Sequence, residues 1–576
     1  MDRITYERDL ALDVLNNTNM SLWEMLRRSV GKHGDRPAVH MADETWTYDQ
    51  LYHRSRKAAA CLSKLGVRKG TRVAFLFHAC PEWAVLHYAL ARLGAIAVPV
   101  NLAFEANELR HVLTTAEPQL VLSVETFRDV HLADKLRGLD EALVDGATKI
   151  PSLPSVRWVG IIPLDAAERP AATHPSTVAV FGSAETKSSD LLVTEQGVAE
   201  PWDPAYIVYT SGSTAFPKPA LCANRAFLGA ATGFVHALRM TPDDRFLAML
   251  PTFHTGGITC VLTAPHLSGG SVDLMGGFEP QLALATIERC RSTVTVGFDT
   301  MYTKMTGTSE FAEADVSSLR KSLLACTPSY IERLRDLWQF DIYATSYGST
   351  ESGTLAAIVP PWAEEDALRT RTNGRPLPGI EVIIVDPETG VRCPPGVLGE
   401  ICFRGWCRVM EYVGMPDETA AAIDEEGYFH SGDYGSIDSD GWLYFRGRYK
   451  QMIKTGGENV SEREVEVFLE EHLDQVEFAQ VVGVPDDTWG EAVVAFVSLP
   501  DGTRFDSEEL RRSCAGAISG YKIPKRFIEI TAGAVPVLAN GRPDKNALRI
   551  LASERSGPRP MRRDDTPESE EERDGA

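Results

Sequence analysis

The chain has 576 residues, which is too long for one ordinary hydrophobic core, so at least two domains are expected. Hydrophobic residues make up 44% and charged residues 24% of the chain, a composition typical of globular proteins. Lys and Arg number 58 against 80 Asp and Glu, and the resulting formal charge of −22 repels polyanions, which excludes nucleic acid as the expected partner.

The N-terminal residues MDRITYERDL carry charge where a signal peptide needs an apolar run. No stretch reaches the roughly 18 to 20 apolar residues of a transmembrane helix, so we expect a cytoplasmic protein. The ten cysteines are scattered, and the closest pair, Cys402 and Cys407, has neither a CxxC spacing nor a neighbouring histidine. This pattern favours reduced core thiols over a metal site or a disulfide framework.

The first 130 residues alternate between helix and strand patterns. A capping box at Thr47 and Gln50 predicts a helix that ends near Leu65. A buried strand is expected at 72–77, a helix at 81–93 closed by Gly94, and a further strand at 95–100. This alternation predicts an α/β fold with a largely parallel sheet and helices on its faces.

Beyond residue 200 the pattern continues with a strand at 207–210. Short strands separated by Pro and Gly turns indicate a more antiparallel region around 380–445. A smaller α/β segment begins near residue 450 and includes a helix from about Glu462 to Glu471. The predicted division is therefore a large domain at 1–449, a small domain at 450–552 and a disordered, charged tail at 553–576.

A loop rich in hydroxyl groups follows the strand at 207–210. It ends in Lys218 and contains the hydroxyl and glycine residues Thr210, Ser211, Gly212, Ser213 and Thr214. Exposed N–H and O–H donors next to one ammonium group can cradle phosphate oxygens. The loop is not a Walker A motif, because the GxxxxGK[ST] spacing is absent.

This loop resembles the phosphate loop of the adenylate-forming superfamily, which includes acyl-CoA synthetases, luciferases and peptide-synthetase adenylation domains. Five further motifs resemble the superfamily's motifs in the superfamily's order: PTFH at 251–254, SYGSTE at 346–351, YFHSGD at 428–433, GRYK at 447–450 and IKTGGENV at 453–460. The last of these is most similar to carnitine/crotonobetaine-CoA ligases and fatty-acid-transport-type acyl-CoA synthetases. The resemblance implies a large adenylation domain of parallel sheets, helices and a distorted β-barrel, followed by a small mobile α+β domain.

The resemblance also implies roles for individual residues. Tyr347 stacks on adenine beside Gly348, and Asp433 accepts both ribose hydroxyls with Arg448 close by. Thr350 bonds the α-phosphate. Three residues complete the site of the large domain: Thr210 and Glu351 as ligands of Mg²⁺, which prefers oxygen ligands, and His254 at the edge of the acid pocket.

In the superfamily the small domain rotates between two half-reactions about a hinge, which corresponds to Lys450. Lys454 and the GGEN loop are expected to face the site in the second half-reaction. The implied cofactors are ATP and Mg²⁺, and coenzyme A is the expected acceptor. The expected partners are a small acid and, as an alternative acceptor, a carrier protein.

Three segments depart from the superfamily pattern. Ala215 and Pro219 replace two glycines around the phosphate loop, and CTPS at 326–329 replaces the Gly-Gly at the edge of the adenine pocket. Arg542 stands where the superfamily has its adenylation lysine. Three interpretations remain open: Arg542 takes that role, Lys545 takes it instead, or adenylation has become weak or specialised.

The sequence thus supports three hypotheses. The first is an AMP-forming acid-CoA ligase. The second is an adenylating enzyme of specialised metabolism that does not use CoA and either loads a carrier protein or activates nitrite to diazotise an aromatic amine. The third is an inactive nucleotide-binding relative, and the presence of Lys218, Glu351 and Asp433 argues against it.

Overall fold

The computed structural model describes residues 2–144, 146–162, 199–210, 217–448, 452–455, 458–486, 489–500, 502–515, 517–539 and 541–554. The chain divides into two compact units. The first is Met1–Gln451 together with Val537–Arg542, and the second is Met452–Pro536 together with Pro543–Ala576. The first unit thus takes in a short segment from the far end of the sequence, a grouping that a linear division of the chain does not anticipate.

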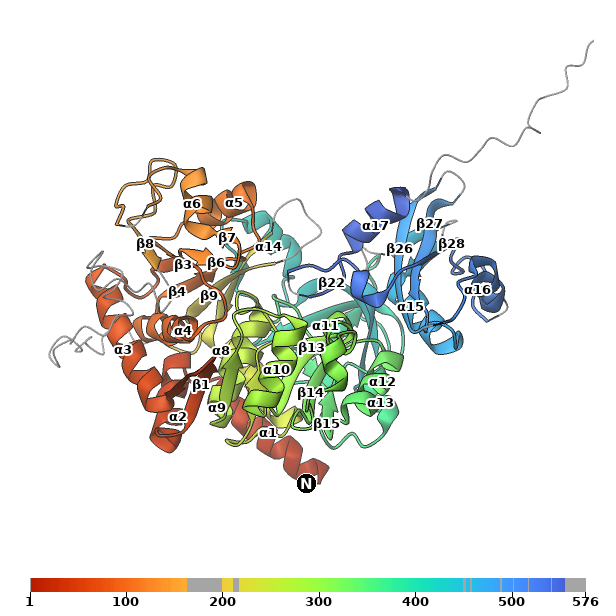
Figure 1. Ribbon diagram of the computed structural model, residues 1–576, viewed down its shortest axis with the longest axis horizontal. Coiled ribbons are helices and arrows are strands. Elements are labelled where there is room, and N and C mark those ends of the chain that lie inside the picture. The colour runs from red at the N-terminus through yellow and green to blue at the C-terminus, as the bar shows by residue number, and fades with distance from the viewer. Residues whose placement is uncertain are drawn as a thin grey trace, which may run out of the picture. The chain divides into compact units, whose positions relative to one another are not determined.

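Two seven-stranded sheets form the body of the first unit (Figure 1). In strand order, one contains β15 (Ile342–Ala344), β14 (Lys321–Ala325), β13 (Val294–Phe298), β11 (Arg245–Leu247), β12 (Ser271–Leu274), β1 (Pro37–Met41) and β2 (Glu44–Thr47). The other contains β21 (Glu411–Tyr412), β10 (Pro219–Ala223), β9 (Pro204–Tyr209), β4 (Ile96–Pro99), β3 (Arg72–Leu76), β5 (Leu120–Val124) and β8 (Trp158–Ile162). Most neighbours in both sheets are parallel, as the βα alternation predicts.

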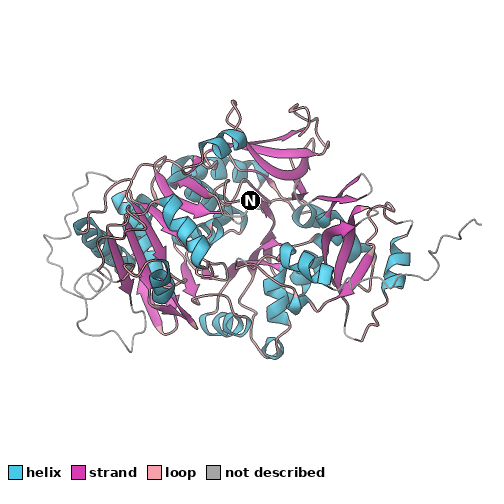
Figure 2. Cartoon of the chain, turned by 90° about the horizontal axis from the view of Figure 1, so that it is seen from above, coloured by secondary structure: helices cyan, strands magenta, loops and turns pink. Residues whose placement is uncertain are grey.

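Helices pack beside the strands of the sheets (Figure 2). The helices of the first unit are α1 (Arg3–Asn17), α2 (Leu22–His33), α3 (Tyr48–Lys64), α4 (Pro81–Leu93), α5 (Ala106–Ala116), α6 (Leu132–Leu139), α8 (Asn224–Ala237), α9 (Ala264–Ser268), α10 (Pro280–Cys290), α11 (Asp299–Thr306), α12 (Pro328–Trp338), α13 (Asp366–Arg371) and α14 (Pro416–Ala422). The described residues of this unit also form a π-helix, η2 (Gly257–Thr263), and a 3-10 helix, η3 (Ser309–Ala312). None of the helices in the described ranges is both long and apolar enough to cross a bilayer.

Two predicted helix boundaries are confirmed by the local chemistry at their ends. The Thr47 hydroxyl accepts from the backbone N–H of Gln50, and the Gln50 side chain accepts from the N–H of Thr47, so α3 begins with the predicted capping box. Helix α4 ends at Gly94, whose φ of 62° is the left-handed conformation that favours glycine.

The region around residues 380–445 is antiparallel, as predicted, and antiparallel pairing already begins at residue 346. It contains a three-stranded sheet of β16 (Ser346–Tyr347), β17 (Ala357–Ile358) and β18 (Arg375–Pro376), and a four-stranded sheet of β19 (Ile380–Val385), β20 (Gly399–Gly405), β22 (Phe429–Ile437) and β23 (Leu443–Arg448). The resemblance implies a distorted β-barrel in the large domain, and these two sheets are antiparallel sheets of that domain. A separate short hairpin joins β6 (Thr126–Phe127) and β7 (Val130–His131).

The second unit has one sheet with helices on both faces. Its strands are β25 (Glu458–Ser461), β24 (Met452–Thr455), β27 (Gly490–Ser498), β26 (Phe478–Asp486) and β28 (Arg526–Glu529). Alternate residues of β26 and β27 face two apolar clusters, one with α15 (Glu462–His472) and α16 (Ser507–Cys514), the other with η5 (Ala532–Ala534) and α17 (Lys545–Glu554). Helix α17 continues through Ser553 and Glu554, the first two residues of the predicted tail, and the other tail residues lie outside the described ranges.

Candidate active site

The ends of the phosphate loop are held together by the hairpin of β9 and β10. Tyr209 pairs with Pro219, and the backbone N–H of Thr210 donates to the Lys218 carbonyl at 3.0 Å. The Lys218 N–H donates in turn to the Thr210 hydroxyl at 3.4 Å. Ser211, Gly212, Ser213 and Thr214 lie outside the described residues, so the hairpin fixes where their loop starts and ends.

The side chains predicted to bind the ribose come from three strands. Asp433 and Arg448 are cross-strand partners on β22 and β23, and Arg448 Nε donates to Asp433 Oδ1 at 3.1 Å. The Tyr347 hydroxyl on β16 donates to Asp433 Oδ2 at 2.8 Å. Burial raises the pKa of Asp433, and the adjacent Arg448 opposes that rise. Each carboxylate oxygen has two lone pairs, so Asp433 can still accept hydrogen bonds from hydroxyl groups.

Glu351 belongs to the loop after β16, and Gly348 fixes the path of that loop. A Cβ at Gly348 would lie 1.8 Å from the carbonyl oxygen of Thr354, so only glycine fits there. Thr350, half-buried, precedes Glu351, and its carbonyl faces the Cys222 thiol at 3.8 Å. The predicted nucleotide motif therefore folds as a tight turn.

Tyr412 contacts two of the predicted site residues and was not among the residues predicted from the sequence. Its hydroxyl donates to Glu351 Oε1 at 3.0 Å, and the Lys218 ammonium lies 4.9 Å from the centre of its ring. Burial and the Glu351 carboxylate raise the pKa of Tyr412, so the hydroxyl stays protonated and remains a donor. Tyr412 reaches this position because β21 pairs with β10, with Tyr412 opposite Ala220. No local pattern around residue 412 signals that pairing.

His254 and Arg542 belong to the same electrostatic environment. His254 precedes the π-helix η2, and its ring lies 4.7 Å from that of Phe253. Burial, reinforced by the positive charge of Arg542, lowers the pKa of His254 to about 4, so its imidazole is neutral at pH 7.

Arg542 is part of the first unit. Its guanidinium carbon lies 5.2 Å from the ring centre of Phe298. The surrounding protein and the positive charge of Arg448 lower the pKa of Arg542, while the carboxylates of Asp433 and Asp299 oppose that effect. The charge of Arg542 therefore acts on His254 and on Asp433 and Arg448, two of the residues predicted to bind the ribose.

Lys545 has different surroundings, within the second unit. Its ammonium pairs with Glu466, lies 3.6 Å from Glu462 Oε2 and donates to the Val481 carbonyl at 2.8 Å. Lys454 is exposed on β24, and its backbone N–H donates to Glu491 at 2.7 Å. The predicted hinge residue Lys450 and the two glycines at 456–457 lie outside the described residues.

The cysteine interpretation needs one correction. The ten cysteines, all within the described residues, form no disulfide, as predicted. Cys402, however, does have a histidine neighbour: its Sγ lies 3.4 Å from Nδ1 of His430, on the adjacent strand. The sequence separation of 28 residues concealed this proximity, which arises because Cys402 and His430 pair across β20 and β22.

Comparisons with known proteins identify the family of the chain. Residues 26–413 match the family model for AMP-binding enzymes, and residues 464–542 match the model for the AMP-binding enzyme C-terminal domain. The chain is 30% identical over 546 residues to indoleacetate–CoA ligase of Aromatoleum aromaticum, covering 93% of this chain and 99% of the relative. It is 30% identical over 520 residues to the fatty acid–[acyl-carrier-protein] ligase ScoC of Streptomyces coeruleorubidus, covering 89% and 93%.

Among solved structures, ATP-bound MatB from Rhodopseudomonas palustris is similar, with a TM-score of 0.76 and 26% identity. The match covers 93% of this chain and 99% of MatB. The two family models together span most of the sequence. The chain belongs to the AMP-binding enzyme family.

Proposed function

We propose that this protein is an ATP-dependent, AMP-forming acid-CoA ligase. In the first half-reaction a carboxylate oxygen attacks the α-phosphorus of ATP, and pyrophosphate leaves as the acyl-adenylate forms. In the second, the thiolate of CoA attacks the acyl carbon, the thiol proton passes to solvent, and AMP leaves. The observation that carries the proposal is the convergence of Glu351, Asp433, Arg448 and Arg542 in one electrostatic environment.

The nucleotide is positioned mainly by Asp433 and its two partners. Tyr347 and Arg448 already donate to the two carboxylate oxygens, so the carboxylate is oriented before a ribose arrives. Such pre-organisation reduces the entropy that binding must otherwise lose. We assign the phosphates to the loop between Thr210 and Lys218, where backbone N–H groups and an ammonium offset anionic charge.

Glu351 suits a hard divalent cation. One oxygen, Oε1, accepts from Tyr412, and within the described ranges no group donates to Oε2. The Glu351 carboxylate is thus held through one oxygen and open through the other, which suits Mg²⁺. Thr210 is the second residue that we assign to Mg²⁺. Bound there, Mg²⁺ would neutralise part of the charge on the phosphate oxygens.

We assign the α-phosphate to Arg542, with Thr350, and the edge of the acid pocket to neutral His254. A guanidinium aimed at the phosphate gains interaction energy as negative charge develops on it in the transition state. Lys545 is left in a structural role, because its ammonium is engaged by buried carboxylates in the second unit. Lys454, with its exposed side chain, is assigned to the second half-reaction, after rotation of the small domain about Lys450.

CoA is proposed as the acceptor because indoleacetate–CoA ligase resembles the chain over nearly its whole length. The relative ScoC is named for a carrier protein, which makes a carrier protein the principal rival acceptor. The identity of the acceptor therefore distinguishes an acid-CoA ligase from a carrier-protein ligase.

A product assay tests the proposal. The protein is incubated with ATP, Mg²⁺ and a panel of carboxylic acids, with and without CoA, and AMP and thioester are quantified by chromatography. CoA-dependent AMP with stoichiometric thioester is the expected result. AMP that requires a carrier protein, or nitrite with an aminobenzoate, would replace the CoA assignment, and no AMP from any acid would leave only nucleotide binding.

A further inference from the structure

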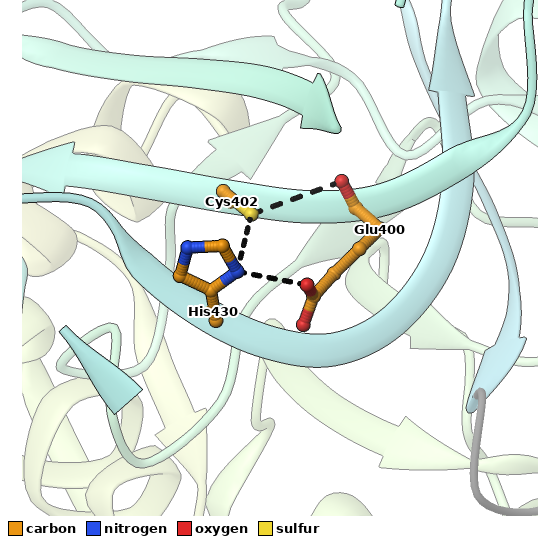
Figure 3. Close-up of side chains that lie close together, drawn as sticks. All are labelled: Glu400, Cys402 and His430. Atoms are coloured by element: carbon orange, nitrogen blue, oxygen red, sulfur yellow. Dashed lines mark hydrogen bonds and ion pairs between the residues drawn. The ribbon is translucent and has the colours of Figure 1, made fainter. Parts of the chain in front are cut away.

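A second group of chemically reactive side chains lies on the antiparallel sheet, outside the nucleotide group. Glu400 and Cys402 are two residues apart on β20, and His430 lies opposite Cys402 on β22 (Figure 3). One ligand atom from each side chain lies within 4.8 Å of the other two. His430 Nδ1 is 2.8 Å from Glu400 Oε2 and 3.4 Å from Cys402 Sγ. Three potential metal ligands thus converge on one point.

These distances are close to those that a single tetrahedral Zn²⁺ imposes on its ligands. With Zn–S of about 2.3 Å and Zn–N and Zn–O of about 2.0 Å, the S···N separation is about 3.5 Å and the N···O separation about 3.3 Å. The observed 3.4 Å between Sγ and Nδ1 matches the first value. The 2.8 Å between Nδ1 and Oε2 is shorter than the second value, so these two atoms must move slightly apart when a metal binds. We propose that Glu400, Cys402 and His430 bind one divalent cation of the zinc class.

The groups around the three ligands already orient them for that role. The other ring nitrogen of His430, Nε2, lies 3.4 Å from Asp424 Oδ2, the carboxylate–histidine arrangement that typically supports a metal-bound imidazole. The backbone N–H of Gly432 donates to Glu400 Oε1 at 2.8 Å, which leaves Oε2 directed at the histidine. The carboxylates of Glu400 and Asp424 also place negative charge next to the Cys402 thiol, and a bound cation would neutralise part of that charge.

Ligand types narrow the choice of metal. A thiolate, an imidazole and a carboxylate together suit Zn²⁺ or Co²⁺ better than Mg²⁺, which prefers oxygen ligands only. Cys402 is fully buried, whereas His430 retains 31% of its side-chain exposure. A cation can therefore reach the cluster from the side of the histidine. The site would cross-link β20 to β22, the strand that also carries Asp433.

The proposal is tested with Co²⁺ as a spectroscopic probe. Metal-free full-length protein is titrated with Co²⁺, then desalted, and its absorption spectrum and metal content are measured. We expect one equivalent of bound metal, a thiolate-to-Co²⁺ charge-transfer band in the near ultraviolet, and loss of that band on addition of Zn²⁺. Saturation with Zn²⁺ should raise the melting temperature by about 3 °C, since the metal binds only the folded state.

Two variants test two of the proposed ligands, and a third serves as a control. Cys402→Ser should abolish the charge-transfer band, and His430→Gln should lower the affinity for Co²⁺ at least tenfold. Cys393→Ser is the matched control, because Cys393 is a partly exposed cysteine of the same region that lies outside the cluster, and it should leave both readings unchanged.

Wild-type protein that retains no Co²⁺ overturns the proposal, and the three side chains then serve only as a hydrogen-bonded clamp. A charge-transfer band that persists in Cys402→Ser overturns it as well, because another cysteine then supplies the thiolate. If Cys402→Ser does not fold, the affinity of His430→Gln for Co²⁺ decides: binding as tight as in the wild type refutes the site. None of these metal-binding measurements depends on the proposed acid-CoA ligase activity.

Discussion

Arg542 and Lys545 are the two cations that compete for the adenylation role, and replacing each by glutamine separates them. Arg542 lies in the first unit, where its charge acts on His254 and Asp433. Lys545 is held by Glu466 and Glu462, whose side chains are only 5% and 7% exposed. The first substitution should therefore affect chemistry, and the second should affect stability.

The magnitudes follow from these surroundings. Loss of one pre-organised donor at a developing anion typically lowers kcat about 10²- to 10³-fold, or about 2.7–4 kcal/mol, which we expect for Arg542→Gln. Lys545→Gln leaves two buried carboxylates with one cation fewer, and breaking a buried pair typically costs about 3–5 kcal/mol. Arg549 still donates to Glu462 at 2.7 Å, so the lower end of that range is expected for the second unit.

Two assays report the half-reactions separately. Acid-dependent ATP–pyrophosphate exchange measures adenylation, and thioester formation from synthetic acyl-adenylate and CoA measures transfer. Arg542→Gln should lose exchange, keep transfer and keep the wild-type urea midpoint. Lys545→Gln should keep the exchange rate of its folded fraction and lose stability. The opposite pattern, in which folded Lys545→Gln loses exchange and Arg542→Gln keeps it, would refute the assignment.

Three further outcomes are expected. Tyr412→Phe removes the 3.0 Å hydrogen bond to Glu351 and should lower kcat/KM for ATP about tenfold, with a higher Mg²⁺ requirement; an unchanged Mg²⁺ titration would contradict this. Asp433→Asn should weaken AMP binding about 10- to 100-fold by calorimetry, since hydrogen bonds to a charged group contribute about 1.5–3 kcal/mol, and unchanged affinity would exclude the ribose role. Burial lowers the pKa of His87 to about 3 and of His266 to about 4, so both are neutral in the folded state and stability is complete above pH 6.5. Protonation of the unfolded chain should lower the free energy of unfolding by about 2 kcal/mol per histidine at pH 5, and equal urea midpoints at pH 8 and pH 5 would contradict this.

The sequence by itself determined features that depend on near neighbours in the chain. The capping box at Thr47 and Gln50 and the left-handed Gly94 mark helix ends, because both act within one helical turn. The SYGSTE and YFHSGD motifs, through their resemblance to the superfamily, predicted that Tyr347 and Asp433 act together, and the structure joins these two side chains by a hydrogen bond; their role in nucleotide binding stays a prediction. Local chemistry was sufficient for these predictions.

Only the tertiary structure decided contacts made by strand pairing. Tyr412 reaches Glu351 because β21 pairs with β10, and His430 reaches Cys402 because β20 pairs with β22. The surroundings of Arg542 likewise depend on the grouping of Val537–Arg542 with the first unit. Register between strands distant in sequence is set by burial over the whole sheet, and that information is not contained in any short segment.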